Sequence, residues 1–185
     1  MQGLDQGKNV YGLYVQNGKW NLKKQDGTID VYTSVEGKIS NVQVKKITPK
    51  DDQEFKEYEA LRIFLENGNN LYVLSLNAAY STASNFFNVL PLIKPEFPIK
   101  VIAYKGDTNF DAIMVEQNGV RFSSYYTKSN NHGKPEWVKQ ANGGYDKTAE
   151  LEFFKESVKE WLQKLWRSKE TTPQKQPSTS FDPNH

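Results

Sequence analysis

Cysteine is absent from all 185 residues of the chain. Its absence excludes disulfide bonds and zinc sites built on thiolates, and it favours the cytoplasm, which for a viral protein is the cytoplasm of the host cell. No apolar run approaches the length of about 18 residues that a membrane span needs. The stretch Met1–Gln6 lacks the charged and apolar regions of a signal peptide. We therefore expect a protein that makes no contact with a membrane.

Motifs for catalysis are equally scarce. Only two histidines occur, His132 and His185, and the sequence has no Gly-x-Ser-x-Gly, no Gly-x-x-x-x-Gly-Lys and no paired-glycine dinucleotide loop. The stretch 107–111 has the oxygen spacing that opens a calcium loop. However, Ala112 replaces the required glycine and Asn118 replaces the closing glutamate. We predict no metal site, no cofactor and no enzymatic activity.

Charge and aromatic content point toward binding. The formal net charge is only +2, so an anionic polymer would have to be held by local groups of Lys and Arg. Residues 1–50 hold eight lysines against four acids, whereas residues 51–100 hold four basic residues against seven acids. This asymmetry suits an anion-facing side and equally suits a random surface distribution. Ten Tyr and ten Phe are more aromatic residues than a small core usually needs.

Strand patterns dominate the first two thirds of the chain. Asn17-Gly18 predicts a hairpin within 10–24 that places Val15 opposite Trp20 and Leu13 opposite Leu22. Trp20 is then a core residue. A third strand follows at 28–32. The alternating pattern predicts further strands over 37–48, 58–66, 71–77 and 99–105, and a hairpin of 110–117 with 120–128.

Two helices are expected. The first follows the strand 71–77, is capped by Ser81 or Ser84, and ends at Pro91. The second begins after Asp146 and covers 147–166, with an apolar stripe at helical spacing. The segment 129–144 is predicted to be a mobile loop and 168–185 a disordered tail.

These elements predict a mainly β fold with two helices. Five strands with a helix between the third and fourth follow the order of an OB-fold, a small Greek-key barrel. We predict a single OB-fold-like domain over 1–167. It comprises an N-terminal hairpin (10–32), the barrel (37–128) and a C-terminal amphipathic helix (147–166).

One predicted strand suggests a binding face. Side chains alternate across a strand, so Leu61, Ile63 and Leu65 lie on the core side. The aromatic rings of Tyr58 and Phe64 and the cation of Arg62 lie on the other side. Such a face can stack on flat bases and hold phosphates. The candidate contacts in this and the other predicted strands are Tyr58, Arg62, Phe64, Tyr72, Arg121, Tyr125, Lys38, Lys45, Lys46 and Lys105.

Each candidate has an ordinary structural alternative. An outward ring on a barrel is often covered by a loop or a helix, and a surface lysine is often only solvated. Tyr72 shares a side with Leu74 and Leu76, so it suits a core position as well as a rim. Arg121 and Tyr125 are expected on the non-core face of the last hairpin.

Three stretches resemble the single-stranded DNA-binding proteins of bacteriophages. They are the opening strand Gly37-Lys38-Ile39-Ser40-Asn41-Val42, the pair Tyr58–Glu66 and Leu71–Leu76, and the closing hairpin Ile113–Tyr126. The resemblance covers roughly residues 37–128 and is a pattern rather than a signature motif. It implies an OB-fold in which exposed aromatics stack on bases and Lys or Arg hold phosphates.

The resemblance also implies a role and partners. Proteins of this family act in DNA replication, recombination or repair, and an acidic tail with an aromatic tip commonly recruits replication partners. The tail of this chain departs from that pattern, because Lys169 and Lys175 balance Glu170 and Asp182. Only Phe181-Asp182 is similar to such a tip.

The first hypothesis is therefore a sequence-tolerant single-stranded DNA-binding protein, with replication or recombination proteins as further partners. An alternative from another class is a β-rich structural or adaptor protein, of viral or other origin. Its last helix and exposed aromatics would bury against other subunits and form homo-oligomers. A carbohydrate-binding module is a third interpretation, since exposed aromatics also stack on sugars.

Overall fold

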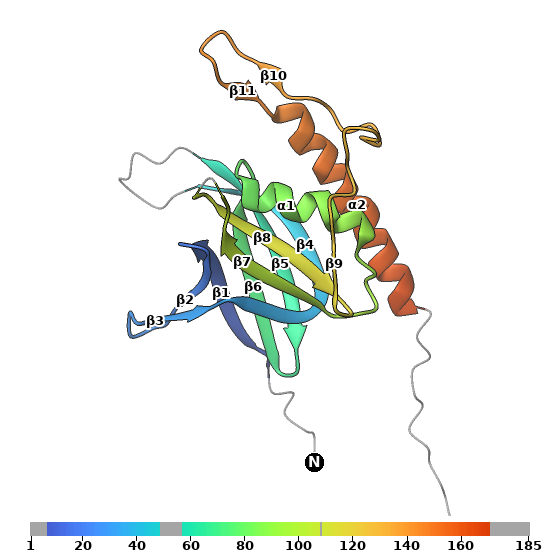
Figure 1. The fold of residues 1–185 in the computed structure, drawn as a ribbon. Coiled ribbons are helices and arrows are strands. Elements are labelled where there is room, and N and C mark those ends of the chain that lie inside the picture. The colour runs from blue at the N-terminus through green and yellow to red at the C-terminus, as the bar shows by residue number, and fades with distance from the viewer. Residues whose placement is uncertain (1–6, 49–56, 108, 171–185) are drawn as a thin grey trace, which may run out of the picture.

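The computed structural model describes residues 7–48, 57–107 and 109–170, the side chains of 169 and 170 excepted. Its main feature is a nine-stranded sheet that curls into a half-barrel, accompanied by two α-helices (Figure 1). The first elements are β1 (Asn9–Gln16), β2 (Lys19–Lys23), β3 (Ile29–Tyr32), β4 (Ser34–Ile47), β5 (Tyr58–Asn67), β6 (Asn70–Asn77) and α1 (Ser81–Val89). The remaining ones are η1 (Leu90–Leu92), β7 (Ile99–Lys105), β8 (Asp111–Gln117), β9 (Val120–Arg121), β10 (Val138–Lys139), β11 (Tyr145–Asp146) and α2 (Thr148–Glu170).

The prediction of a mainly β fold with two α-helices is confirmed for the part of the chain that the structure describes. Within that same part, neither helix combines the length and the apolar character that a membrane crossing requires.

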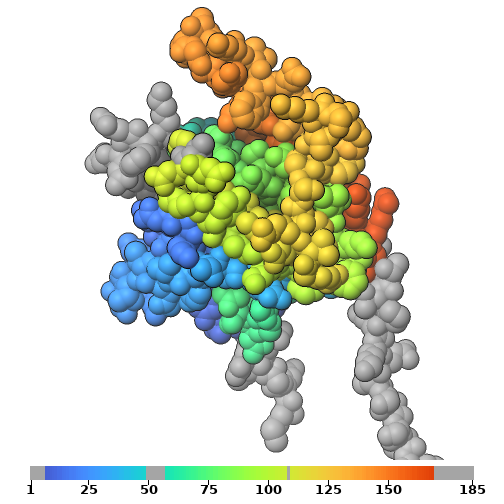
Figure 2. All heavy atoms as spheres, in the orientation of Figure 1, coloured from blue at the N-terminus to red at the C-terminus, as the bar shows by residue number. Residues whose placement is uncertain are grey.

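The strands lie in the order β3-β2-β1-β6-β5-β4-β7-β8-β9. Neighbouring strands of this sheet are antiparallel, except that β1 pairs with β6 in parallel. The N-terminal hairpin therefore extends the sheet beyond β6, and the register predicted from Asn17-Gly18 is confirmed, with Leu13 opposite Leu22 and Val15 opposite Trp20. The hairpin β10–β11 forms a separate two-stranded sheet that projects from the body beside the start of α2 (Figures 1 and 2).

The strand β4 produces much of the curl. Its first residues pair with β7, and from Lys38 onward it pairs with β5. Gly37 lies at this crossover, where a Cβ atom would stand 2.8 Å from the carbonyl oxygen of Glu66. A register shift between Ile39 and Asn41 marks a β-bulge, which bends a strand and increases its twist.

The core lies between the curled sheet and the helices. Leu61, Ile63 and Leu65 of β5 are fully buried, and they belong to one cluster with residues of α1 and α2. The rings of Phe87 on α1 and Phe154 on α2 stack with their centroids 4.6 Å apart. The apolar stripe of the last helix therefore docks on its own domain.

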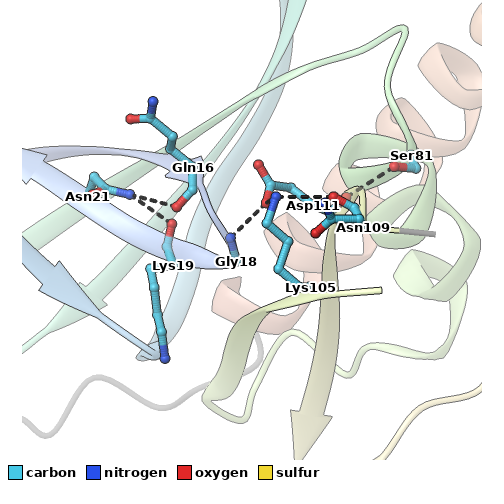
Figure 3. Close-up of polar contacts among 8 residues, drawn as sticks. All are labelled: Gln16, Gly18, Lys19, Asn21, Ser81, Lys105, Asn109 and Asp111. Carbon is cyan, nitrogen blue, oxygen red and sulfur yellow. Dashed lines mark hydrogen bonds and ion pairs between the residues drawn. The ribbon is translucent and has the colours of Figure 1, made fainter. Parts of the chain in front are cut away.

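The N-terminal hairpin also contacts β7 and β8, on the opposite side of the curled sheet. Trp20 is completely buried, as predicted, and its Nε1 donates to the carbonyl oxygen of Val101 on β7 at 3.1 Å. At the β1–β2 turn, the amide of Gly18 donates to the Asp111 carboxylate at 2.7 Å (Figure 3). The space-filling view shows the hairpin, in blue, lying against the body of the molecule (Figure 2). The hairpin thus joins the two ends of the curled sheet.

Two local predictions were wrong. The N-cap of α1 is Tyr80, and no side chain caps the helix, because Ser81 Oγ donates instead to the Asp111 carbonyl at 3.1 Å. The second arm of the closing hairpin ends at Arg121 rather than at residue 128. Phe122 keeps its expected hydrogen bond to Val115, but the amide of Tyr125 donates to Asn88 at the end of α1, which draws the chain away from β8.

The helix boundaries differ modestly from the prediction. The helix α2 begins at Thr148 and runs to Glu170, past the predicted end at 166. The Asp146 carboxylate accepts from the Thr148 amide at 2.9 Å. Hydrogen bonding from the side chain of Thr148 and then from its amide holds the pKa of Asp146 below its usual value. The segment 129–144, predicted to be a loop, contains β10, which pairs with β11 just beyond it. Residues 49–56 and the predicted tail residues 171–185 lie outside the described residues.

The β1–β2 turn provides a test of the closure. Gly18 and Gly27 both have positive φ, so alanine at either site should cost about 1–2 kcal/mol through backbone strain. A Cβ at Gly18 would also lie 2.7 Å from the Lys105 amide nitrogen, whereas one at Gly27 would meet nothing within 4 Å. We expect Gly18→Ala to lose about 1–3 kcal/mol more than Gly27→Ala in urea denaturation. Equal losses in the free energy of unfolding would mean that the β1–β2 turn does not pack closely against β7.

Candidate nucleic-acid interface

A cleft of about 760 Å³ lies where β5 begins and β6 ends. Four aromatic rings line it, Tyr14, Tyr58, Tyr80 and Phe110, and we call it the aromatic cleft. The rings come from β1, β5, the residue before α1 and the residue before β8. Exposed fractions of 41% for Tyr58, 65% for Tyr80 and 71% for Phe110 leave their faces accessible. A volume of this size suits a small ligand or one unit of a polymer.

The register explains how β1, β5 and β6 contribute to the cleft. Tyr14 pairs with Ser75, and Ala60 pairs with Asn77, so these residues share the side of the sheet opposite to Leu61 and Leu76. All four line the cleft. The floor of the cleft therefore includes the outward face of the sheet, while Val15 and Leu76 contribute from the core side.

The two most exposed rings are placed by loops. Tyr80 has an extended backbone immediately before α1, so its side chain is not drawn into the helix. Phe110 follows Asn109, whose φ of 61° is a conformation that asparagine tolerates better than most residues. The turn is held by hydrogen bonds between Gly106 and the backbone of Asn109 and Phe110. Tyr80 thus lies directly before the first turn of α1, and Phe110 is hydrogen-bonded to Gly106 directly before β8.

Cations flank the aromatic cleft. Lys147 lines it, with its Nζ 4.2 Å from the centroid of Trp137. Lys105 stands beside it and contacts Asp111 at 3.1 Å and the carbonyl oxygen of Asn109 at 3.1 Å (Figure 3). The Asp111 carboxylate also accepts from Gly18, so its negative charge is balanced within the protein.

Arg62 and Phe64 continue the outward face along β5. Arg62 lies between Gln43 and Ser75, and Phe64 lies between Asn41 and Val73. Both side chains are half-buried. The Nε of Arg62 is buried and has no hydrogen-bond partner among the described residues. The guanidinium as a whole is half-buried next to Ser75, and an arginine at the surface can bind a phosphate oxygen or a base edge through its terminal nitrogens.

The ten sequence candidates separate into two groups. Tyr58 lines the aromatic cleft, Arg62 and Lys45 pair with the cleft residues Ser75 and Ala60, and Lys105 contacts the cleft residue Asp111. Phe64 lies on the same face of β5, two residues beyond Arg62.

The other five do not join them. Tyr72 faces inward and stacks on Tyr11 at 5.6 Å, so its rim placement is corrected in favour of the core side. Arg121 contacts Glu116 at 3.4 Å on the short β9. Exposed Lys38 pairs with Glu66 at the far end of β5, and Lys46 forms an ion pair with Glu57 that lowers the pKa of Glu57.

Tyr125 is the clearest correction among the site residues. The chain has left the sheet at this point, and the Tyr125 ring stacks on His132 at 4.0 Å. The cause is the hydrogen bond from the Tyr125 amide to Asn88, which replaces strand pairing with β8.

Sequence reasoning missed Tyr14, Tyr80, Phe110 and Lys147 as site residues. Three of them lie in or beside polar segments, and a large ring in a polar turn is the only local signal they offer. Searches against family models, curated proteins and solved structures found no match for this chain. The assignment of function therefore rests on the geometry of the aromatic cleft.

The exposed rings should contribute little to folding. We expect Tyr80→Ala and Phe110→Ala to change the free energy of unfolding by less than about 0.5 kcal/mol, as is usual for surface positions. Phe87→Ala, by contrast, removes a ring that is 1% exposed and should cost about 3–5 kcal/mol. Urea denaturation of the three variants measures this. A large loss at residue 80 or 110 would show that the ring serves the fold.

Proposed function

We propose that the protein is a sequence-tolerant single-stranded DNA-binding protein that acts in DNA replication, recombination or repair. The observation that carries the proposal is the aromatic cleft, in which four separated segments place rings beside Lys147, Lys105 and Arg62. A base stacked on an aromatic side chain gains about 1–3 kcal/mol, and neighbouring cations hold the phosphates.

The strand order supports an OB-fold as the scaffold for this activity. Strands β4, β5, β6, β7 and β8, with α1 between β6 and β7, lie in the spatial order β6-β5-β4-β7-β8. In an OB-fold the first strand likewise lies between the second and the fourth. OB-folds bind oligonucleotides on strands two and three and on the adjoining loops. Their counterparts here are β5, β6 and the β7–β8 connection, which all contribute to the aromatic cleft.

The chemistry of the cleft favours a single strand over a duplex. In a duplex both faces of each base are already stacked, whereas the exposed rings of Tyr58, Tyr80 and Phe110 need an open base face. Rings accept any base, so the predicted preference among sequences is weak. The half-buried guanidinium of Arg62 and the ammonium groups of Lys45 and Lys147 suit phosphate oxygens.

The adaptor alternative has one observation of its own. At the sheet edge, Ile29 and Val31 of β3 are 50% and 57% exposed, and an apolar edge strand can pair with another chain. This alternative predicts stable oligomers whether or not DNA is present. Size-exclusion chromatography with light scattering, with and without oligo(dT), distinguishes the two functions.

Titration with oligo(dT) at two salt concentrations tests the proposal directly. With three or four phosphate contacts, the slope of log K against log salt should be about −2 to −3. Quenching of the tyrosine and tryptophan fluorescence reports the binding. No binding at low salt would refute the proposal, and binding that ignores salt would favour a sugar ligand instead.

Variants locate the interface. We expect Tyr58→Ala and Phe110→Ala each to weaken oligo(dT) binding by about 5- to 150-fold, the equivalent of one lost stacked base. Trp166→Ala is the matched control, because Trp166 is 57% exposed near the C-terminal end of α2 and is not among the residues that line the cleft. Arg62→Gln should weaken binding, whereas Arg121→Gln, on β9, should not. Equal effects of the two arginine variants would place the interface elsewhere.

A further inference from the structure

A smaller cleft, of about 330 Å³, adjoins the aromatic cleft next to the start of α2. We call it the lateral cleft. Three residues line both clefts, Ala79, Tyr80 and Lys147. Because the same side chains form part of both walls, a chain-like ligand in the aromatic cleft can continue past Tyr80 into the lateral cleft.

The β10–β11 hairpin forms one wall of the lateral cleft. Gln140, Tyr145 and Asp146 line the cleft from the hairpin side, and Glu150, Leu151 and Phe154 line it from α2. The hairpin projects from the body of the molecule beside the first turns of α2 (Figure 1). None of the ten residues that the sequence suggested for binding lies on this wall.

One face of the β10–β11 hairpin carries two rings and two cations. Lys139 pairs with Tyr145, so their side chains share a face. Trp137 lies two residues before Lys139, and Lys147 lies two residues after Tyr145, so both return to that face. Two contacts agree with this placement. The ring centroids of Trp137 and Tyr145 are 5.8 Å apart, and the Lys147 Nζ lies 4.2 Å from the Trp137 centroid.

Trp137 is held in place while its ring stays accessible. Its Nε1 donates to Oε2 of the buried Glu150 at 2.6 Å. Trp137 is nevertheless 44% exposed, and Tyr145 beside it is 54% exposed. A base that stacks here meets an indole whose position is fixed before binding, which lowers the entropic cost of binding.

The acids near this face are engaged within the protein. Oε1 of Glu150 lies 2.9 Å from Nζ of Lys134, in an ion pair whose angles are not those of a hydrogen bond. The Asp146 carboxylate accepts from the Thr148 amide at the start of α2. Lys139 is exposed and forms no ion pair within the part of the chain that the structure describes. The face therefore presents rings together with a cation that is available to a phosphate.

We propose that the lateral cleft is a second base-stacking subsite for the DNA single strand held in the aromatic cleft. This inference rests on the proposed function. The strand passes Tyr80, and its next base stacks on Tyr145 and Trp137 at the mouth of the lateral cleft. Lys139 and Lys147 contact the phosphates on either side of that base.

Tryptophan fluorescence of the full chain tests this subsite. Trp20 and Trp161 are buried, so of the four tryptophans only Trp137 and Trp166 can stack on a base. In the Trp166→Phe variant, we expect dT16 to quench the Trp137 emission in step with the binding curve. The binding curve comes separately from the fluorescence anisotropy of labelled dT16. A variant that carries both Trp137→Phe and Trp166→Phe should still bind dT16 and lose this quenching.

A pair of substitutions at one position isolates the ring. Trp137→Phe and Trp137→Ala both remove the hydrogen bond to Glu150, but only the second removes the ring. We expect Trp137→Ala to bind dT16 about 5- to 150-fold more weakly than Trp137→Phe, the equivalent of one lost stacked base.

A pair of lysine variants tests the phosphate contact without touching the rings. Lys139→Gln should weaken dT16 binding and reduce the steepness of log K against log salt by about 1. Lys164→Gln removes an exposed charge on α2 and should bind dT16 like the wild type. If Trp137→Ala fails to fold, these two variants and the quenching of Trp137 still decide the question.

Each outcome has a distinct meaning. Wild-type protein that does not bind dT16 overturns the proposed function and this inference with it. Binding of dT16 without quenching of Trp137, or equal affinities of Trp137→Phe and Trp137→Ala, overturns the lateral subsite alone. An oligomer that Trp137→Ala dissociates while dT16 binding stays unchanged would also overturn it, because the hairpin face would then serve protein contacts.

Discussion

The Trp20 indole spans the interior of the curled sheet from β2 to the Val101 carbonyl on β7. Four strands separate β2 from β7 in the sheet order, so this hydrogen bond can form only if the sheet curls back on itself. Burial of the whole ring supplies the hydrophobic driving force, and the hydrogen bond to Val101 satisfies the buried indole N–H. The contact between Gly18 and Asp111 fixes the same closure at the rim.

The aromatic cleft is a consequence of that closure. Tyr14 belongs to the N-terminal hairpin and Phe110 to the β7–β8 connection, and they line one cleft because the hairpin turn rests against the end of β7. Asp111 links the hairpin, the end of β7 and the start of α1 directly. Its carboxylate contacts Gly18 and Lys105, and its carbonyl oxygen accepts from the hydroxyl of Ser81, the first residue of α1. The stability of the fold and the geometry of the candidate site therefore share the same few contacts.

The inward and outward sides of the sheet carry different kinds of residue. The inward side carries the aliphatic core and receives both helices, as the fully buried Leu61 and Phe86 show. The outward side of β5, β6 and β1 carries the half-buried guanidinium of Arg62, the ring of Tyr14 and the bare backbone of Gly12. None of these three improves packing, and each is suited to contact with a flat, charged ligand. This contrast is the physical basis for assigning the outward side to binding.

The sequence by itself determined the local elements: the hairpin register from Asn17-Gly18, the two faces of β5 from alternation, and the docked stripe of α2 from helical spacing. These follow from steric and periodic rules that act over a few residues. Only the tertiary structure decided that β1 joins β6 in parallel, that Tyr72 turns inward onto Tyr11, and that Tyr125 leaves the sheet for Asn88. It also decided that Tyr80 and Phe110 meet in one cleft. Such partners lie far apart in the chain, and their pairing depends on how the whole sheet curls, which no local pattern encodes.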